Sequence, residues 1–348
     1  MKQIISLLVA LALFALPALA EEGAFSVPQE SVAFSMETAF SVLQLAGPQT
    51  ADAARTLFEG MGFSVLRQEN YAKDVSDHSH TSAYTVAAGA AQIRGETRTL
   101  VVISVRGTAD GEWYSNFDFA GKTGGDCQYA ENFMEAARAI FDAAKPDIDA
   151  YENPVVLATG YSRGAACANL LGVLLDEAYG TGDVYVYTFA TPNTVRTADA
   201  DYPNIFNLVN MNDAVTRMPL SAWGFRRAGV DIELRDPDFV NADMHEMFLA
   251  LLGVCPDIAS YYNDRHSLAA PGLSDDGITF YELFQAVADA FTNGTPSAET
   301  QAFFQQIMTA QNDMTAFFSL FMGTSDNSFF DQHMATVYTK LMGEYDGK

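Results

Sequence analysis

One serine lies between two glycines at the end of an apolar run, in the stretch ATGYSRGAACANLLG at residues 158–172. A sharp strand-to-helix turn needs glycines such as Gly160 and Gly164 where side chains would collide with neighbouring backbone. Such a turn holds the serine hydroxyl at a helix N-terminus, where the dipole and free N–H groups favour developing negative charge. The spacing therefore predicts that Ser162 is a nucleophile.

A nucleophilic serine also needs hydrogen-bond donors for an oxyanion. The pattern G-x-S-x-G arises by chance in about one chain in ten of this length, so the motif alone is weak evidence for a nucleophile. The donors are a further requirement that the sequence has to meet. The residue after the serine, Arg163, supplies one backbone N–H. The apolar segment 99–105 is followed by Arg-Gly-Thr, and Thr108 offers both an N–H and a hydroxyl. We expect Thr108 and Arg163 to form the oxyanion hole.

The carboxylate that orients the base is predicted from its place in the chain. The segment NIFNLVN, residues 204–210, is read as a strand, and Asp213 follows it closely. An acid just past the carboxyl end of a strand lies at the sheet edge where active sites of open α/β folds collect. Asp213 is therefore the predicted acid, ahead of Asp199, Asp201 and Asp243.

The base is a histidine, and the chain has five. Among the chain orders in which serine triads occur, the one that starts with the serine places the base after the acid. Three histidines satisfy that order, namely His245, His266 and His333. His245 lies in an apparent amphipathic helix and His266 in a polar loop, so the residues alone leave the choice open.

Apolar periodicity predicts the elements that would position these residues. Helical spacing recurs twice within residues 30–62 and again over residues 132–145 and 165–178. Short apolar runs predict strands at residues 99–105, 154–160, 184–191 and 204–210, the first of them central, and a hairpin is expected around Gly89. Alternating strands and helices imply mostly parallel pairing, so the predicted fold class is α/β, a central sheet flanked by helices.

The first twenty residues, MKQIISLLVALALFALPALA, are typical of a cleavable secretory signal. They combine Lys2, an apolar core and the small residues Ala18 and Ala20. We expect cleavage after Ala20, an extracellular mature protein, and a single domain over residues 21–348.

After residue 220 the strand–helix alternation weakens. Residues 277–323 read as two or three helices rich in Phe, Leu and Met. Such helices either pack on the sheet as an ordinary pair or form a cap with an apolar inner face over the active site.

Charge and cysteine content exclude several classes of partner and site. The chain carries 44 acidic and 19 basic residues, for a net charge of −25, which argues against nucleic acids and anionic bilayers as partners. Its three cysteines, Cys127, Cys167 and Cys255, lack the spacing of a zinc site. We expect them to be free core residues, with a Cys127–Cys255 disulfide as the alternative.

Four segments together resemble the class 3 lipases, an α/β-hydrolase family of secreted triacylglycerol lipases and related esterases. They are VVISVRGTADGEWYSNFDF, ATGYSRGAACANLLG, YTFATPNTV and NLVNMNDAVTRMPLSAWGF, in that order. The resemblance implies an α/β-hydrolase fold with Ser162 as nucleophile, Asp213 as acid, and Thr108 with Arg163 as oxyanion hole. It implies hydrolysis of acylglycerols or other carboxylic esters through an acyl-enzyme, with no cofactor or metal, and transient contact with a lipid interface.

The resemblance also ranks the candidate bases. The segment DQHMATVY at residues 331–338 resembles the family's closing pattern of a histidine with a tyrosine five residues later. His333 is therefore the preferred base. His266 is the alternative, at a separation from the acid like that of compact family members. Arg163 replaces the family's common leucine, so we expect a cation at the mouth of the site.

Two other functional classes remain as alternatives. One is a catalytically silent α/β-hydrolase domain used for binding, which would lack a complete triad. The other is a serine peptidase or an acyltransferase, which would use the same nucleophile on a different substrate.

Overall fold

A computed structural model describes residues 25–72, 80–109, 128–196, 201–217, 225–235, 298, 331–345 and 347. The predicted signal over residues 1–20 lies outside these residues, as do Cys127, Cys255 and all of the expected cap over residues 277–323 except Ala298. Within the described residues, no helix is both long and apolar enough to cross a membrane.

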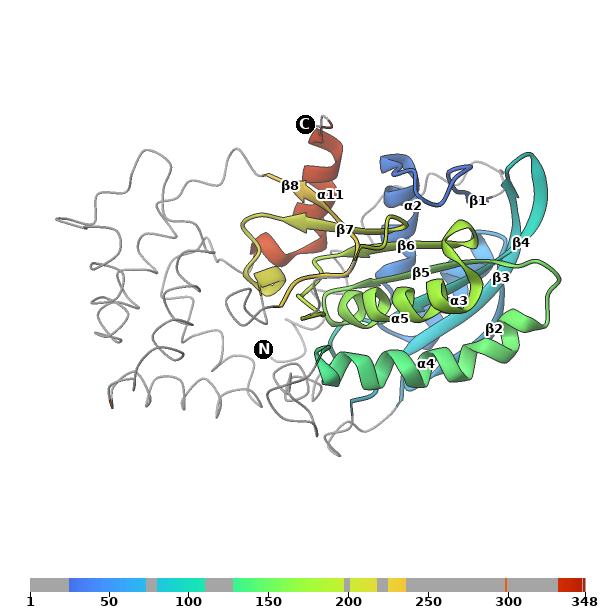
Figure 1. The fold of residues 1–348 in the computed structure, drawn as a ribbon, viewed down its shortest axis with the longest axis horizontal. Coiled ribbons are helices and arrows are strands. Elements are labelled where there is room, and N and C mark those ends of the chain that lie inside the picture. Colours follow the sequence, from blue (N-terminus) through green and yellow to red (C-terminus); the bar gives the residue numbers. More distant parts are fainter. Residues whose placement is uncertain are drawn as a thin grey trace.

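A mostly parallel sheet forms the centre of the described structure (Figure 1). Its strands follow the order β1-β3-β4-β5-β6-β7-β8, and β2 pairs with β3. The strands are β1 Phe25–Ser26, β2 Ser64–Glu69, β3 Tyr84–Ile93, β4 Glu96–Val105, β5 Val155–Tyr161, β6 Val184–Phe189, β7 Ile205–Asn210 and β8 Val230–Leu234. From β4 to β8 every neighbouring pair is parallel, whereas β3 runs antiparallel to both β2 and β4. The predicted α/β fold class is confirmed.

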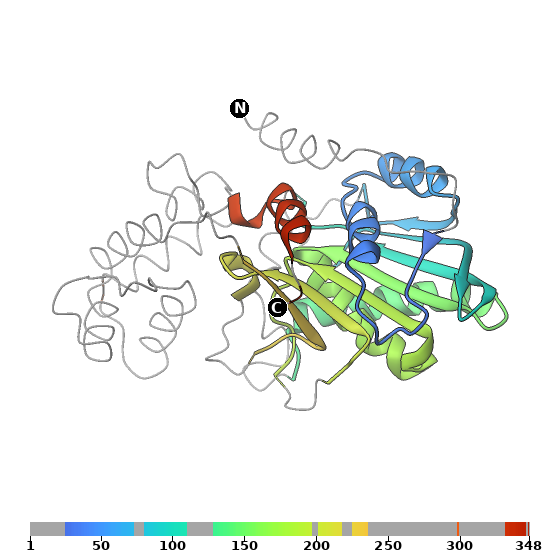
Figure 2. The same cartoon turned by 90° about the horizontal axis from the view of Figure 1, so that it is seen from above.

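Helices cover both faces of this sheet (Figures 1 and 2). The helices are α2 Met36–Ala46, α3 Ala51–Gly60, α4 Glu131–Asp149, α5 Arg163–Tyr179 and α11 Ala335–Glu344. Helices α4 and α5 share one apolar cluster with the sheet, and α2, α3 and α11 contribute to the cluster on the other face.

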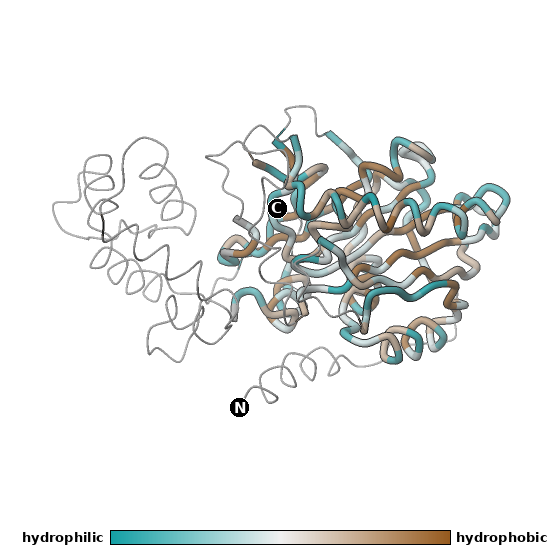
Figure 3. Tube along the Cα trace, turned by 90° about the horizontal axis from the view of Figure 1, so that it is seen from below, coloured by the Kyte–Doolittle hydropathy of each residue, from teal (hydrophilic) through white to brown (hydrophobic). Residues whose placement is uncertain are grey.

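The apolar run in β4 explains why this strand is internal. Val101 and Ile103 belong to the cluster under α4 and α5, whereas Leu100 and Val102 belong to the cluster under α2. Because successive side chains of a strand point to opposite faces, a strand covered on both sides has apolar residues at consecutive positions. Figure 3 shows hydrophobic residues along the central strands and hydrophilic ones at the outer turns.

The helices predicted within residues 30–62, 132–145 and 165–178 are confirmed, and side-chain caps mark two of their starts. Ser35 Oγ accepts a hydrogen bond from Thr38 N at the start of α2, and Thr50 Oγ1 accepts one from Ala53 N at the start of α3. Each cap satisfies a backbone donor that the first turn leaves without a partner.

The predicted hairpin around Gly89 is wrong. Strand β3 runs through Gly89 without interruption, and the chain turns instead at Arg94 and Gly95, both with positive φ. The glycine at position 89 has a packing role, because a Cβ there would lie 2.8 Å from Cδ1 of Phe63. Strands β2 and β8 were not predicted, since their exposed and buried positions mix without a long apolar run.

We predict that Gly89→Ala lowers the free energy of unfolding by about 1–3 kcal/mol, because the added methyl group overlaps the Phe63 ring. Gly60→Ala is the matched control, since a Cβ at Gly60 in α3 meets nothing within 4 Å. Urea unfolding of both variants measures the difference. Equal stabilities would contradict the close approach of Phe63.

Candidate active site

The turn between β5 and α5 places Ser162 at the start of the helix. Ser162 has φ 56° and ψ −123°, a conformation that L-residues rarely adopt. A Cβ on Gly160 would collide with the carbonyl group of Gly164, and a Cβ on Gly164 would collide with the carbonyl oxygen of Val105 in β4. The two glycines therefore allow three backbone segments to meet at the serine.

Three predicted site residues meet at this turn. His333 Nε2 lies 2.9 Å from Ser162 Oγ, and His333 Nδ1 lies 2.7 Å from Asp213 Oδ2. The serine and the histidine are 171 positions apart in the sequence. Only 13% of the His333 side chain and 1% of the Asp213 side chain are exposed. The alternatives His266 and His245 lie outside the described residues.

Two donors beside the histidine hold the Asp213 carboxylate. Asp213 Oδ1 accepts a hydrogen bond from Val215 N at 2.9 Å, and Oδ2 accepts one from the Tyr338 hydroxyl at 2.8 Å. Burial raises the pKa of the Tyr338 phenol well above its ordinary value, and the negative charge of Asp213 raises it further. The phenol therefore stays protonated and keeps donating to the carboxylate.

The loop with the expected second oxyanion donor lies beside the turn. Val105, the last residue of β4, pairs with Gly160, so the segment through Thr108 leaves the sheet next to Ser162. A Cβ on Gly107 would lie 3.2 Å from the carbonyl oxygen of Tyr161. This packing brings the Thr108 loop alongside the first turn of α5, where Arg163 follows the serine.

The expectation that the Arg163 side chain lies at the mouth of the site is wrong. This residue is 1% exposed, its Nη2 donates to the carbonyl oxygen of Thr81, and its guanidinium lies over the Phe133 ring of α4. The stacking and hydrogen bond favour an inward conformation over solvent exposure. Cys167, further along α5, is buried in the core as expected, with its Sγ 3.4 Å from Ser82 Oγ.

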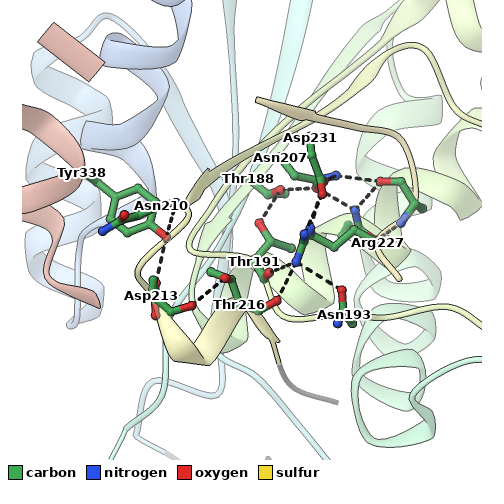
Figure 4. A network of polar contacts seen from close by, with 12 residues as sticks. Thr188, Thr191, Asn193, Asn207, Asn210, Asp213, Thr216, Arg227, Asp231 and Tyr338 are labelled. Atoms are coloured by element: carbon green, nitrogen blue, oxygen red, sulfur yellow. Dashed lines mark hydrogen bonds and ion pairs between the residues drawn. The ribbon is translucent and has the colours of Figure 1, made fainter. Parts of the chain in front are cut away.

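A buried polar network supports the Asp213 turn from beneath (Figure 4). Its centre is Arg227, whose guanidinium donates to Asp231 at 2.8 and 2.6 Å, to Thr191 O at 3.2 Å, to Asn193 Oδ1 at 3.2 Å and to Thr216 O at 2.6 Å. Thr216 Oγ1 in turn donates to the carbonyl oxygen of Asp213 at 2.7 Å. Burial disfavours the Arg227 charge, but attraction to and hydrogen bonding with Asp231 outweigh it and raise the arginine pKa.

Sequence reasoning missed the residues that support the site. Arg227 and Asp231 stand four positions apart, a spacing that suggests only a surface ion pair when the fold is unknown. Tyr338 was part of the closing histidine–tyrosine pattern but carried no role, since its bond to Asp213 spans 125 positions.

The geometry provides a serine, an imidazole and a carboxylate in hydrogen-bonded sequence, an arrangement that can transfer a proton from the serine during attack on a carbonyl. No group of three or more His, Cys, Asp or Glu residues in the described part of the chain could hold a metal ion.

Comparison with known proteins agrees with this chemistry. Residues 102–223 match the family model of class 3 lipases. The resemblance seen in the sequence is thereby confirmed, and the chain is a carboxylic ester hydrolase of the lipase type. The matched residues span the end of β4, the Ser162 turn and Asp213, whereas His333 lies beyond them.

Solved structures of lipases are similar to the chain at low identity. A Rhizomucor miehei lipase propeptide complex is 18% identical, covers 59% of this chain and 69% of its own, and has a TM-score of 0.46. A lipase from Rhizopus microsporus var. chinensis is 16% identical to this chain and has a TM-score of 0.43. The match covers 64% of this chain and 85% of that lipase.

We predict that Arg227→Met lowers the free energy of unfolding by about 3 kcal/mol, because it leaves Asp231 without its cation. This value is at the lower end for a broken buried ion pair, since Asp231 is partly exposed. Arg235→Met is the matched control. Its partner is Glu233 and both side chains are exposed, so a change below about 1 kcal/mol is expected. Chemical unfolding measures both variants, and equal losses would contradict the central place of Arg227.

Proposed function

We propose that this lipase-type hydrolase cleaves acylglycerols or other lipid esters with Ser162, His333 and Asp213 as its catalytic triad. The observation that carries the proposal is the pair of His333 hydrogen bonds, 2.9 Å to Ser162 Oγ and 2.7 Å to Asp213 Oδ2. The match of residues 102–223 to a lipase family supports esters as the substrate class.

Each residue of the triad has one task. Neutral His333 accepts the serine proton through Nε2 while Ser162 Oγ attacks the ester carbonyl carbon. Asp213 accepts a hydrogen bond from the Nδ1–H, which fixes the tautomer and stabilises the imidazolium that forms. When the bond to the alcohol oxygen breaks, His333 returns the proton to the leaving alcohol. Water then attacks the acyl-Ser162 by the same route and releases the acid.

The oxyanion is held by backbone donors in this mechanism. The N–H of Arg163 belongs to the first turn of α5, where the helix dipole also favours negative charge. Thr108 supplies the second donor from the loop after β4. The inward Arg163 side chain, bonded to Thr81 and stacked on Phe133, helps to fix the position of its own N–H.

Two further parts of the proposal rest on the sequence. Residues 1–20 direct export, which places the protein outside the cell. The Phe- and Leu-rich residues 277–323 cover an apolar acyl-binding site, which suits lipid substrates and transient contact with a lipid interface.

We predict that Ser162→Ala and His333→Ala each reduce kcat for ester hydrolysis by at least about 10³-fold and leave the fold intact. The double variant should lose no more than either single variant, because the residues act as a unit. Hydrolysis of p-nitrophenyl esters of graded chain length and of a triglyceride emulsion measures this, with circular dichroism as the fold check. Ser41→Ala, at a half-buried serine of α2, is the control. Retention of a tenth of the activity by Ser162→Ala would overturn the assignment.

We predict that kcat/KM stays level on the alkaline side up to about pH 10. The rate stays level in alkali because the phenols of Tyr161 and Tyr338 stay protonated. Burial raises the pKa of each phenol well above its ordinary value, and the Asp213 charge adds to the shift. Because the pKa of each phenol is higher in the folded than in the unfolded protein, the protonated phenols stabilise the fold below about pH 10. This stabilisation is lost as the pH rises through the pKa of the folded state. A pH–rate profile tests this. An alkaline loss below pH 10 that disappears in Tyr338→Phe would contradict it.

A further inference from the structure

Two adjacent carbonyl groups beside the imidazole are held by residues of two different strands. The Tyr161 hydroxyl donates to the carbonyl oxygen of His333 at 2.7 Å. Asn210 Nδ2 donates to the carbonyl oxygen of Gln332 at 2.9 Å. Tyr161 ends β5 directly before Ser162, and Asn210 ends β7 three residues before Asp213. The backbone of the histidine is thus tied to both strands that carry its two partners.

The segment around His333 has little regular structure of its own to fix this position. His333 ends the three-residue 3-10 helix η7, Asp331–His333, and α11 starts only at Ala335. The imidazole must nevertheless meet Ser162 and Asp213 at once. Because a misplacement of about 1 Å can cost about 100-fold in rate, the position of this backbone bears directly on proton transfer.

The Tyr161 ring also packs beside the site. Its centroid lies 5.7 Å from that of the His333 ring and 5.6 Å from that of Tyr338, the latter edge to face. Burial raises the pKa of the Tyr161 phenol well above its ordinary value, and the Asp213 charge adds to the shift. The hydroxyl therefore stays protonated and remains a donor to the His333 carbonyl.

We propose that Tyr161 is a positioning residue for the base. The second residue of the Gly-Tyr-Ser-Arg-Gly turn fastens the main chain of His333 to the strand that delivers the nucleophile, so that strand and turn fix both members of the proton-transfer pair. The inference rests on the proposed function, because it gives the hydrogen bond a catalytic purpose. The side chain acts through the histidine and not on the substrate.

The test compares Tyr161→Phe with Tyr185→Phe. Both tyrosines donate a 2.7 Å hydrogen bond to a carbonyl oxygen, but the partner of Tyr185 is Pro28, which lies in the segment before α2 and not in the triad. We expect similar falls in the denaturation midpoint, whereas only Tyr161→Phe lowers kcat, by about tenfold to a hundredfold, with KM unchanged. The low-field proton resonance of the His333–Asp213 hydrogen bond should shift or broaden in Tyr161→Phe alone.

The same substitution in a His333→Ala background completes the test. Without the imidazole there is nothing to position, so Tyr161→Phe should cause no further loss of the residual activity. Wild-type kcat in Tyr161→Phe, an equal loss in Tyr185→Phe, or an undiminished effect in the His333→Ala background would overturn the inference. Failure of the proposed function is separate, because it would show as activity retained by Ser162→Ala.

Discussion

The close approach of three backbone segments at the Ser162 turn is the constraint on which the rest of the site depends. The first turn of α5 lies so near the ends of β4 and β5 that neither Gly160 nor Gly164 has room for a Cβ. The strain at Ser162, with its positive φ, is maintained because the buried sheet and helix on either side hold both ends of the turn. The serine hydroxyl is thereby directed away from the core and toward His333.

The carboxyl ends of neighbouring parallel strands explain how distant residues converge here. Strand β4 leads to the Thr108 loop, β5 to Ser162 and β7 to Asp213, and all three strands point the same way in one sheet. The acid also has rigid support below it, since Arg227 ties its turn to the loop after β6 and to β8. The histidine comes from the last described segment of the chain and is held by Tyr161 and Asn210.

The sequence predicted the parts of the fold that depend on local physical rules. Glycine spacing located the turn, continuous apolar runs located β4 to β7, and the place of Asp213 after β7 brought it to the correct sheet edge. Features that depend on tertiary contacts were not accessible. Gly89 was read as a turn although it accommodates the Phe63 ring, and the Arg163 side chain was expected at the mouth of the site although it packs on Phe133.

The choice among the three candidate histidines also depends on tertiary contacts, because only the folded chain reveals which histidine meets the serine. The most direct test is therefore fluorophosphonate labelling of the full chain, with the labelled peptide mapped by mass spectrometry and the rate compared between His333→Ala and His266→Ala. The account predicts a single adduct on Ser162, formed at the wild-type rate in His266→Ala and at a greatly reduced rate in His333→Ala. Labelling at another residue, or rapid labelling of Ser162 without His333, would contradict it.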